Sequence, residues 1–135
     1  MGRYLLDSNA FLTFKAEPHK LRKEAHEAIT AGENRIFISL AGLWEMGIKA
    51  ANGKLPQFAK LIASGPGALR EALRESDFTL LQIELEHAMA AIRLPQHHRD
   101  PFDRMMIAQA QLEGLTLISN DGIFERYTGL SLLSA

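Results

Sequence analysis

The chain has 135 residues, of which 47% are hydrophobic and 23% are charged. This balance is typical of a folded globular protein and excludes a disordered, collagen-like or coiled-coil chain. The absence of cysteine excludes thiol catalysis, disulfides and cysteine-ligated zinc. Fifteen basic and sixteen acidic side chains give a net charge of −1, which by itself does not point to a polyanionic partner. The length predicts that residues 1–135 form a single domain.

No apolar run in the sequence indicates a targeting signal or a membrane-spanning segment. The apolar run Tyr4–Leu6 is too short for the core of a signal peptide, and Asp7 ends it. No stretch approaches the roughly 18 apolar residues of a membrane span. We therefore expect a cytoplasmic protein with no membrane partner.

Short strand-like runs alternate with longer segments of helical periodicity. Such alternation predicts an α/β protein with a parallel sheet covered by helices on both faces. In chain order, the pattern predicts strand Tyr4–Leu6, helix Leu21–Ala31, strand Ile36–Ile38, helices Leu40–Ala51, Pro56–Ala63 and Ala68–Glu75, strand Thr79–Ile83, helices Glu84–Leu94 and Phe102–Leu112, strand Thr116–Ile118 and a fifth candidate strand at Leu130–Leu133.

Four acidic residues lie close to the predicted ends of strands or starts of helices. Asp7 follows the first strand, Glu45 lies in the helix after the second, Asp121 follows the fourth, and Asp103 lies in the first turn of its helix. In a parallel sheet at least three of them share one edge, where ligands of α/β proteins bind. Each also has a structural interpretation as a helix cap, a turn residue or a solvated helix residue.

A cluster of carboxylates needs protons or cations, because the negative charges repel one another. Glu45 in particular stands between Trp44 and Met46, where an ionised carboxylate is costly without a positive partner. Mg²⁺ and Mn²⁺ prefer oxygen ligands, and ions held by carboxylates assist hydrolysis of phosphodiesters. The pattern therefore predicts metal-assisted hydrolysis with Mg²⁺, or Mn²⁺, as cofactor.

Four motifs follow one another along the chain: Leu5-Leu6-Asp7-Ser8-Asn9, Ser39–Leu55, His98–Ala110 and Ile118–Phe124. In this order they resemble the motifs of PIN-domain nucleases, and more narrowly those of VapC-type toxins of type II toxin–antitoxin systems. The resemblance extends over nearly the whole chain. It implies a three-layer α/β/α PIN-like domain, with a central, mainly parallel sheet of four or five strands. It also implies a metal-dependent endoribonuclease that hydrolyses RNA phosphodiester bonds.

The resemblance assigns roles to individual residues. Asp7, Glu45, Asp103 and Asp121 would be the catalytic, metal-binding acids, with Glu45 orienting or deprotonating the attacking water. Gly42 departs from the pattern, since relatives often carry Ser or Thr at this place. Polar side chains near the metals or the scissile phosphate would be Asn9, Ser39, Ser119 and Asn120.

Basic and imidazole side chains lie close to these acids in the sequence. We interpret His97 and His98 as residues of a solvated loop beside the site, and Asp100 as a helix N-cap. The segment Lys49–Arg74 carries five cations and one acid, so part of it is a candidate for contact with an RNA backbone. Candidates for contact with RNA phosphates, against the plainer interpretation of solvated or salt-bridged side chains, are Lys49, Lys54, Arg99 and Arg104.

The resemblance also implies protein partners. A cognate antitoxin would dock along the helices around Lys20–Ala31 and Leu40–Lys60 and insert a residue, commonly arginine, into the acidic site. A homodimer is expected as well. Two alternatives remain, namely a PIN-domain RNA-processing nuclease without an antitoxin and a non-catalytic domain that binds through an acidic pocket. A haloacid-dehalogenase-like phosphatase would need a second Asp where Asn9 stands, and a receiver domain would need an acid in place of Ser8.

Overall fold

Five strands form one sheet in the computed structural model, which describes residues 1–135. The order across the sheet is β3-β2-β1-β4-β5, and every neighbouring pair is parallel. The predicted α/β class with a parallel central sheet is therefore confirmed. The strands are β1 (Arg3–Leu6), β2 (Arg35–Ser39), β3 (Phe78–Leu81), β4 (Thr116–Ser119) and β5 (Leu132–Ser134).

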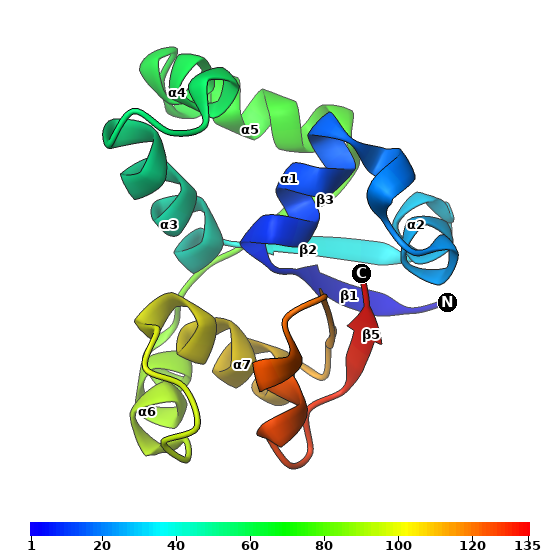
Figure 1. The fold of residues 1–135 in the computed structure, drawn as a ribbon, viewed down its shortest axis with the longest axis vertical. Helices are drawn as coiled ribbons and strands as arrows, with labels where there is room; N and C mark the ends of the chain where they lie inside the picture. The colour runs from blue at the N-terminus through cyan, green and yellow to red at the C-terminus, as the bar shows by residue number, and fades with distance from the viewer.

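Helices cover both faces of the sheet (Figure 1). Helices α1–α5 lie on one face, and α6, α7 and a short 3₁₀ segment lie on the other. The helices are α1 (Ser8–Ala16), α2 (Lys23–Thr30), α3 (Leu40–Ala51), α4 (Pro56–Ala63), α5 (Pro66–Glu75), α6 (Leu85–Arg93) and α7 (Pro101–Glu113), with 3₁₀ segments at Pro18–Lys20 and Gly122–Arg126. None of them combines the length and the apolar character that a membrane span requires.

Two apolar clusters, one on each face, hold the helices to the sheet. Successive side chains of a strand point to opposite faces, so Leu6 and Ile118 pack against helices α1–α5. Their neighbours Leu5 and Leu117 pack against α7 and the segment Gly122–Arg126. This alternation confirms the three-layer α/β/α arrangement.

The register of the central strands brings three chain segments to one edge of the sheet. Leu6 of β1 pairs with Ile38 of β2 and with Ile118 of β4. The residues that follow these strands therefore leave the sheet side by side. Because all strands are parallel, this shared edge is the carboxyl end of the sheet, where ligands of α/β proteins bind.

Helix α1 is the one helix that the sequence pattern missed. It begins directly after Asp7, whose carboxylate accepts a hydrogen bond from the backbone N–H of Ala10 at 2.8 Å. Polar residues after a strand are equally typical of a loop, which is why the start of this helix was not predicted.

Other boundaries move by a few residues. Helix α5 begins at Pro66, since proline is compatible with the first helical turn. Strand β3 begins and ends earlier than the predicted Thr79–Ile83, and β5 begins two residues after the start of the predicted Leu130–Leu133.

Candidate functional site

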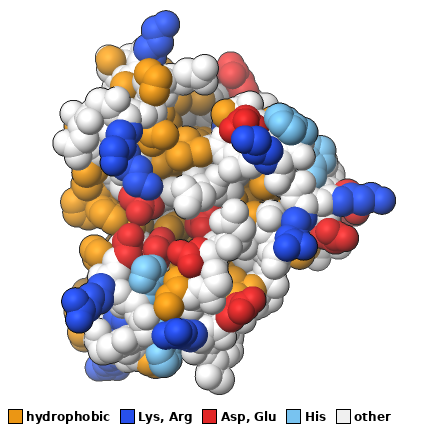
Figure 2. Space-filling model, viewed as in Figure 1, with side chains coloured by type: hydrophobic (Ala, Val, Ile, Leu, Met, Phe, Trp, Pro, Cys, Tyr) orange, Lys and Arg blue, Asp and Glu red, His pale blue; other side chains and the backbone are white.

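A polar cavity of about 230 Å³ opens at the carboxyl edge of the sheet. We call it the acidic pocket. None of its lining residues is hydrophobic, and all four predicted acids are among them. Figure 2 shows the acidic side chains gathered in a hollow between the half of the molecule that carries α1–α5 and the half that carries α6 and α7. The lining residues are Asp7, Ser8, Asn9, Glu45, Lys49, His98, Asp100, Asp103 and Asp121.

Asp7 and Asp103 are each placed by the start of a helix. Asp7 caps α1 and is only 5% exposed. Asp103 lies in the first turn of α7, whose N-cap is Asp100. The Asp100 carboxylate accepts hydrogen bonds from the backbone N–H groups of Phe102 at 2.9 Å and Asp103 at 3.2 Å. The interpretation of Asp100 as a cap is confirmed, and the same residue also lines the pocket.

Glu45 enters the pocket from α3 and is held by a residue of α1. The Ser8 hydroxyl donates to Glu45 Oε1 at 2.6 Å. A Cβ atom on Gly42 would lie 3.3 Å from this hydroxyl oxygen, so the side chain of Ser8 occupies space beside the glycine. Ser8, which was not among the predicted site residues, therefore holds Glu45 from another helix. The place of Ser8 directly after Asp7 was the available signal in the sequence.

Asp121 is the most exposed of the four acids and caps the segment Gly122–Arg126. Its Oδ1 accepts from the backbone N–H of Ile123 at 3.1 Å, and its own N–H donates to the Ser119 hydroxyl at 3.0 Å. It also lines a neighbouring cavity of about 190 Å³, together with Ser119 and Asn120. The predicted polar residues Ser119 and Asn120 therefore lie beside the acidic pocket.

Ser39 does not line either cavity. It is fully buried, caps α3 through a bond from the Ala41 N–H at 3.0 Å, and donates to Gln109 Oε1 at 2.6 Å. Its hydroxyl therefore joins α3 to α7 inside the protein, in contrast to the expected place near the metals or the scissile phosphate. Asn9, in contrast, is exposed and lines the acidic pocket.

The electrostatics of the pocket favour a cation. Burial raises the pKa of Asp7 above its ordinary value, and the neighbouring carboxylates of Glu45 and Asp121 raise it further. The Ser119 hydroxyl and the Ala10 N–H act in the opposite direction without cancelling these effects. A raised pKa means that the ionised carboxylate lacks sufficient compensation in the protein alone.

The pKa of Asp103 is raised as well. Burial, together with smaller contributions from the carboxylates of Asp100 and Glu45, raises the pKa of Asp103 to about 6, against the lowering effect of a hydrogen bond from His98. Asp103 also belongs to both groups of side chains whose ligand atoms lie within 4.8 Å of one another. One group is His98, Asp103 and Asp121, and the other is Glu45, Asp100 and Asp103.

This donor set suits a hard divalent ion. Carboxylate oxygens are the ligands that Mg²⁺ and Mn²⁺ prefer, and Lys49 is the only lysine or arginine that lines the pocket. Asp7 is outside both of the close groups but lines the same cavity. The residues present therefore fit a site for Mg²⁺ or Mn²⁺.

The four predicted phosphate contacts have different surroundings. Lys49 lines the acidic pocket, whereas Lys54 and Arg99 are exposed and do not line it. Arg104 donates four hydrogen bonds to backbone carbonyls of the last turn of α6 and of the loop between α6 and α7, at 2.8 to 3.3 Å. Because these bonds engage both terminal nitrogens of its guanidinium, the expectation that Arg104 contacts RNA phosphate is corrected.

His98 also differs from its interpretation as a solvated loop residue. Its Nε2 lies 2.7 Å from Asp103 Oδ2, and its side chain is 21% exposed. His97 is exposed, and its ring packs edge-on against Tyr127. Adjacent histidines cannot be distinguished from the sequence, because only the path of the loop decides which one faces the site.

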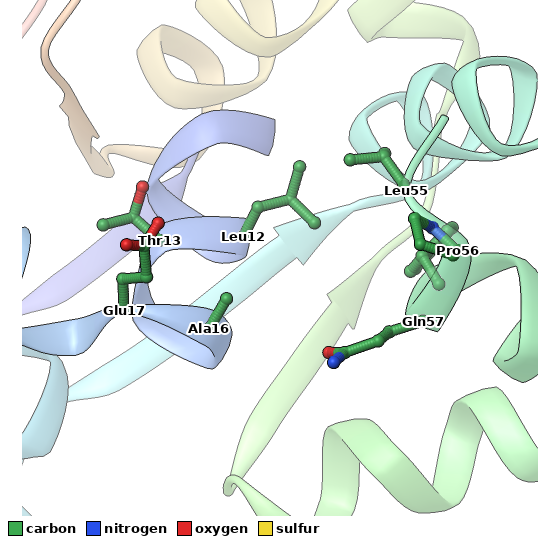
Figure 3. Close-up of a pocket in the computed structure, with 8 residues that line it drawn as sticks. Leu12, Thr13, Ala16, Glu17, Leu55, Pro56 and Gln57 are labelled. Atoms are coloured by element: carbon green, nitrogen blue, oxygen red, sulfur yellow. The ribbon is translucent and has the colours of Figure 1, made fainter. Parts of the chain in front are cut away.

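An apolar groove of about 370 Å³ lies apart from the acidic pocket. Figure 3 shows its two walls facing each other, with residues of α1 such as Leu12 and Ala16 on one side and the segment Leu55–Gln57 on the other. The residues Leu55–Gln57 of this groove fall within the segment Leu40–Lys60, one of the two expected to contact an antitoxin.

A family model described as PIN domain matches residues 4–130. The chain therefore belongs to the PIN-domain family. A sequence search of curated proteins gives no match.

Solved structures with the same fold come from toxin–antitoxin complexes. VapBC2 from Rickettsia felis, bound to a DNA fragment from its promoter, is 19% identical with a TM-score of 0.70, and 98% of each chain is covered. DNA-bound VapBC from Salmonella typhimurium is 21% identical with a TM-score of 0.68, covering 99% of this chain and 98% of the other. VapBC-1 from nontypeable Haemophilus influenzae is 19% identical with a TM-score of 0.68, covering 98% and 97%. At these identities the similarity establishes the fold.

Proposed function

We propose that this protein is a metal-dependent endoribonuclease and the toxin of a type II toxin–antitoxin pair, of the VapC type. One observation carries the proposal. Four carboxylates from four separate segments of a PIN-domain chain converge on one cavity without a hydrophobic lining residue. Since the pKa values of two of them, Asp7 and Asp103, are raised, the arrangement favours binding of a cation over a purely structural role.

Asp7, Glu45, Asp103 and Asp121 would hold Mg²⁺ or Mn²⁺. When bound, such an ion supplies Lewis-acid stabilisation of the charge that develops on a phosphodiester and lowers the pKa of water. The residues of the chain position the reactants. The Ser8 hydroxyl holds one oxygen of Glu45 and leaves the other to orient water or to accept its proton.

The basic and amide side chains in and near the acidic pocket support RNA as the substrate. Lys49 lines the acidic pocket and is placed to contact a phosphate of RNA, and the exposed side chains of Lys54 and Arg99 are candidates for further phosphate contacts. Asn9 supplies an amide that can bond to ribose or phosphate oxygens. These contacts act on the backbone, so they give affinity and position without specifying a sequence.

We propose a cognate antitoxin as the protein partner, because the similar folds occur in VapBC toxin–antitoxin complexes. The apolar groove between α1 and Leu55–Gln57 provides a surface for an apolar segment of such a partner. An inserted arginine would reach the acidic pocket and neutralise its carboxylates. We also propose that the protein acts in the cytoplasm as a homodimer of single-domain chains.

The test is cleavage of a structured RNA by the purified protein with Mg²⁺ or Mn²⁺, with DNA of the same sequence as a parallel substrate. Wild type is compared with Asp7→Asn and with a matched control, Asp77→Asn, which makes the same change in an exposed turn outside the pocket. We expect RNA to be cut by the wild type and the control, and Asp7→Asn to lose the activity. Equal cleavage by wild type and Asp7→Asn, or undiminished cleavage in EDTA, would overturn the proposal.

The same preparations separate the alternatives. Metal binding without cleavage of any RNA would favour a non-catalytic domain that binds through its acidic pocket. Cleavage by a protein that no neighbouring gene product inhibits would favour an RNA-processing nuclease without an antitoxin. Co-purification with a small DNA-binding protein that blocks cleavage is the result expected for a toxin.

A further inference from the structure

Arg104 forms hydrogen bonds along the connection between α6 and α7. Arg104 Nη2 donates to the carbonyl oxygens of Ala91 at 2.8 Å and Leu94 at 3.0 Å. Its Nη1 donates to the carbonyl oxygens of Pro95 at 2.9 Å and His98 at 3.3 Å. The guanidinium thus joins the end of one helix, the following loop and the first turn of the next helix.

These bonds reach carbonyls at the C-terminal end of α6 and in the loop after it, although the Ala91 carbonyl also accepts from the backbone N–H of Leu94 at 3.4 Å. The last carbonyls of a helix have no intrahelical donor, and a cation near a helix C-terminus is favourable. Hydrogen bonds from an ionised guanidinium are stronger than those between neutral groups. The same loop receives a further contact, because Tyr127 Oη donates to the Pro95 carbonyl at 3.4 Å. The path of residues 94–100 is therefore fixed by side chains on both flanks.

The fixed loop delivers His98 to Asp103. The distance from His98 Nε2 to Asp103 Oδ2 is 2.7 Å. An ionised carboxylate can only accept hydrogen bonds, so Nε2–H is the donor. The imidazole ring also packs edge-on against Phe124, with ring centroids 6.2 Å apart and planes at 83°, which limits its rotation. One oxygen of Asp103 is therefore held in place.

Asp103 is the side chain for which orientation matters most. It is the only acid common to both groups of candidate ligands, His98–Asp103–Asp121 and Glu45–Asp100–Asp103. A side chain that orients a ligating carboxylate changes metal affinity without touching the metal, and loss of such a partner typically weakens binding about 10- to 100-fold.

We infer that His98 is a positioning residue of the acidic pocket, which orients Asp103 for a divalent cation, and that Arg104 sets the place of His98. The inference rests on the proposed function, since it concerns the same site. It assigns to His98 and Arg104 a role in metal binding that acts through Asp103.

The first test measures Mn²⁺ affinity by calorimetry for the wild type, His98→Ala, His98→Gln and the control His97→Ala. His97 is the adjacent residue of the same loop but does not line the pocket. We expect His98→Ala to bind Mn²⁺ about 10-fold more weakly or worse. His98→Gln recovers most of the affinity, because its amide N–H donates to a carboxylate, and His97→Ala binds like the wild type.

A spectroscopic measurement distinguishes positioning from direct ligation. Electron spin echo spectra of Mn²⁺ bound to the wild type should show no modulation from a directly coordinated ¹⁴N, because Nε2 is engaged by Asp103. A coordinated ¹⁴N signal that disappears in His98→Ala would show that His98 is itself a ligand and would overturn the inference. Wild-type affinity in His98→Ala, or equal loss in His98→Gln and His98→Ala, would overturn it as well.

Arg104→Lys tests the second half of the inference. Lysine keeps the charge but cannot bond to four carbonyls in the geometry of the planar guanidinium. In a variant whose circular dichroism spectrum matches the wild type, we expect weaker Mn²⁺ binding that is not additive with His98→Ala. Full additivity would refute the link between the two residues. A wild type that binds no Mn²⁺ would instead overturn the proposed function, and the inference with it, whereas failure of the His98 series alone leaves the proposed function intact.

Discussion

Replacing Asp103 by Asn should stabilise the metal-free protein, although it would remove a carboxylate from the proposed metal site. Burial raises the pKa of Asp103 from 3.8 to about 6, so the folded state binds the proton more tightly than the unfolded state. Stability therefore falls as the pH rises from the unfolded value to the folded value, and the full loss is present above about pH 6. Asn removes the charge and keeps an oxygen that accepts the hydrogen bond from His98.

The size of the effect follows from the same numbers. A rise from 3.8 to about 6 corresponds to at most about 3 kcal/mol. The side chain of Asp103 is 15% exposed in a pocket open to water, and its place in the first turn of α7 favours a negative charge. Solvent screening and this helix contribution reduce the expected gain to about 1–2 kcal/mol. For a chain of this size that is a rise in Tm of about 3–8 °C.

The assay is thermal denaturation followed by circular dichroism in EDTA, between pH 4 and pH 8. The difference in Tm between Asp103→Asn and the wild type should be largest above about pH 6 and should shrink as the pH falls towards 4. Glu33→Gln, in an exposed turn, is the control for loss of a negative charge and should show a smaller change. A lower Tm for Asp103→Asn at pH 7.5, or a difference independent of pH, would refute the reasoning.

Three further predictions concern individual contacts. Ser8→Ala removes the hydroxyl that holds Glu45 and should slow RNA cleavage about 10-fold with an unchanged circular dichroism spectrum; a wild-type rate would contradict this. Ser39→Ala removes the cap of α3 and the donor to Gln109, so urea denaturation should show a loss of about 1–3 kcal/mol, and a loss below about 0.5 kcal/mol would refute it. Lys49→Ala should weaken RNA binding by inactive Asp7→Asn and reduce the salt dependence by about one counterion, whereas an unchanged salt slope would exclude the phosphate contact.

The fold and the four acids were predictable because they depend on patterns of short range. The runs Tyr4–Leu6 and Thr116–Ile118 are short and apolar, and the acids that follow them reach one edge once the strands are parallel. The order of the motifs then identified the family, which the match over residues 4–130 confirms. The register of β1 with β2 and β4 explains why separate segments meet at one pocket.

The surroundings of the acids were not predictable, because they depend on contacts between distant segments. Ser8 reaches Glu45 across 37 positions of sequence, and Ser39 turns away from the pocket to Gln109, 70 positions later. Arg104 bonds to the end of α6 and to the loop that follows it, 6 to 13 positions earlier in the sequence. A charged side chain beside an acid predicts a salt bridge or a phosphate contact equally well, and only the tertiary structure shows that this one binds backbone carbonyls.

The rate of RNA cleavage as a function of Mn²⁺ concentration is the most direct test of a carboxylate-held metal in the acidic pocket. The protein is first freed of metal by chelation, and wild type is compared with Asp7→Asn. We expect no cleavage without added metal and a saturable rise for the wild type, over the concentrations at which calorimetry detects Mn²⁺ binding. For Asp7→Asn we expect no comparable rise. Cleavage that persists in excess chelator, or an equal rise in Asp7→Asn, would contradict the proposed site.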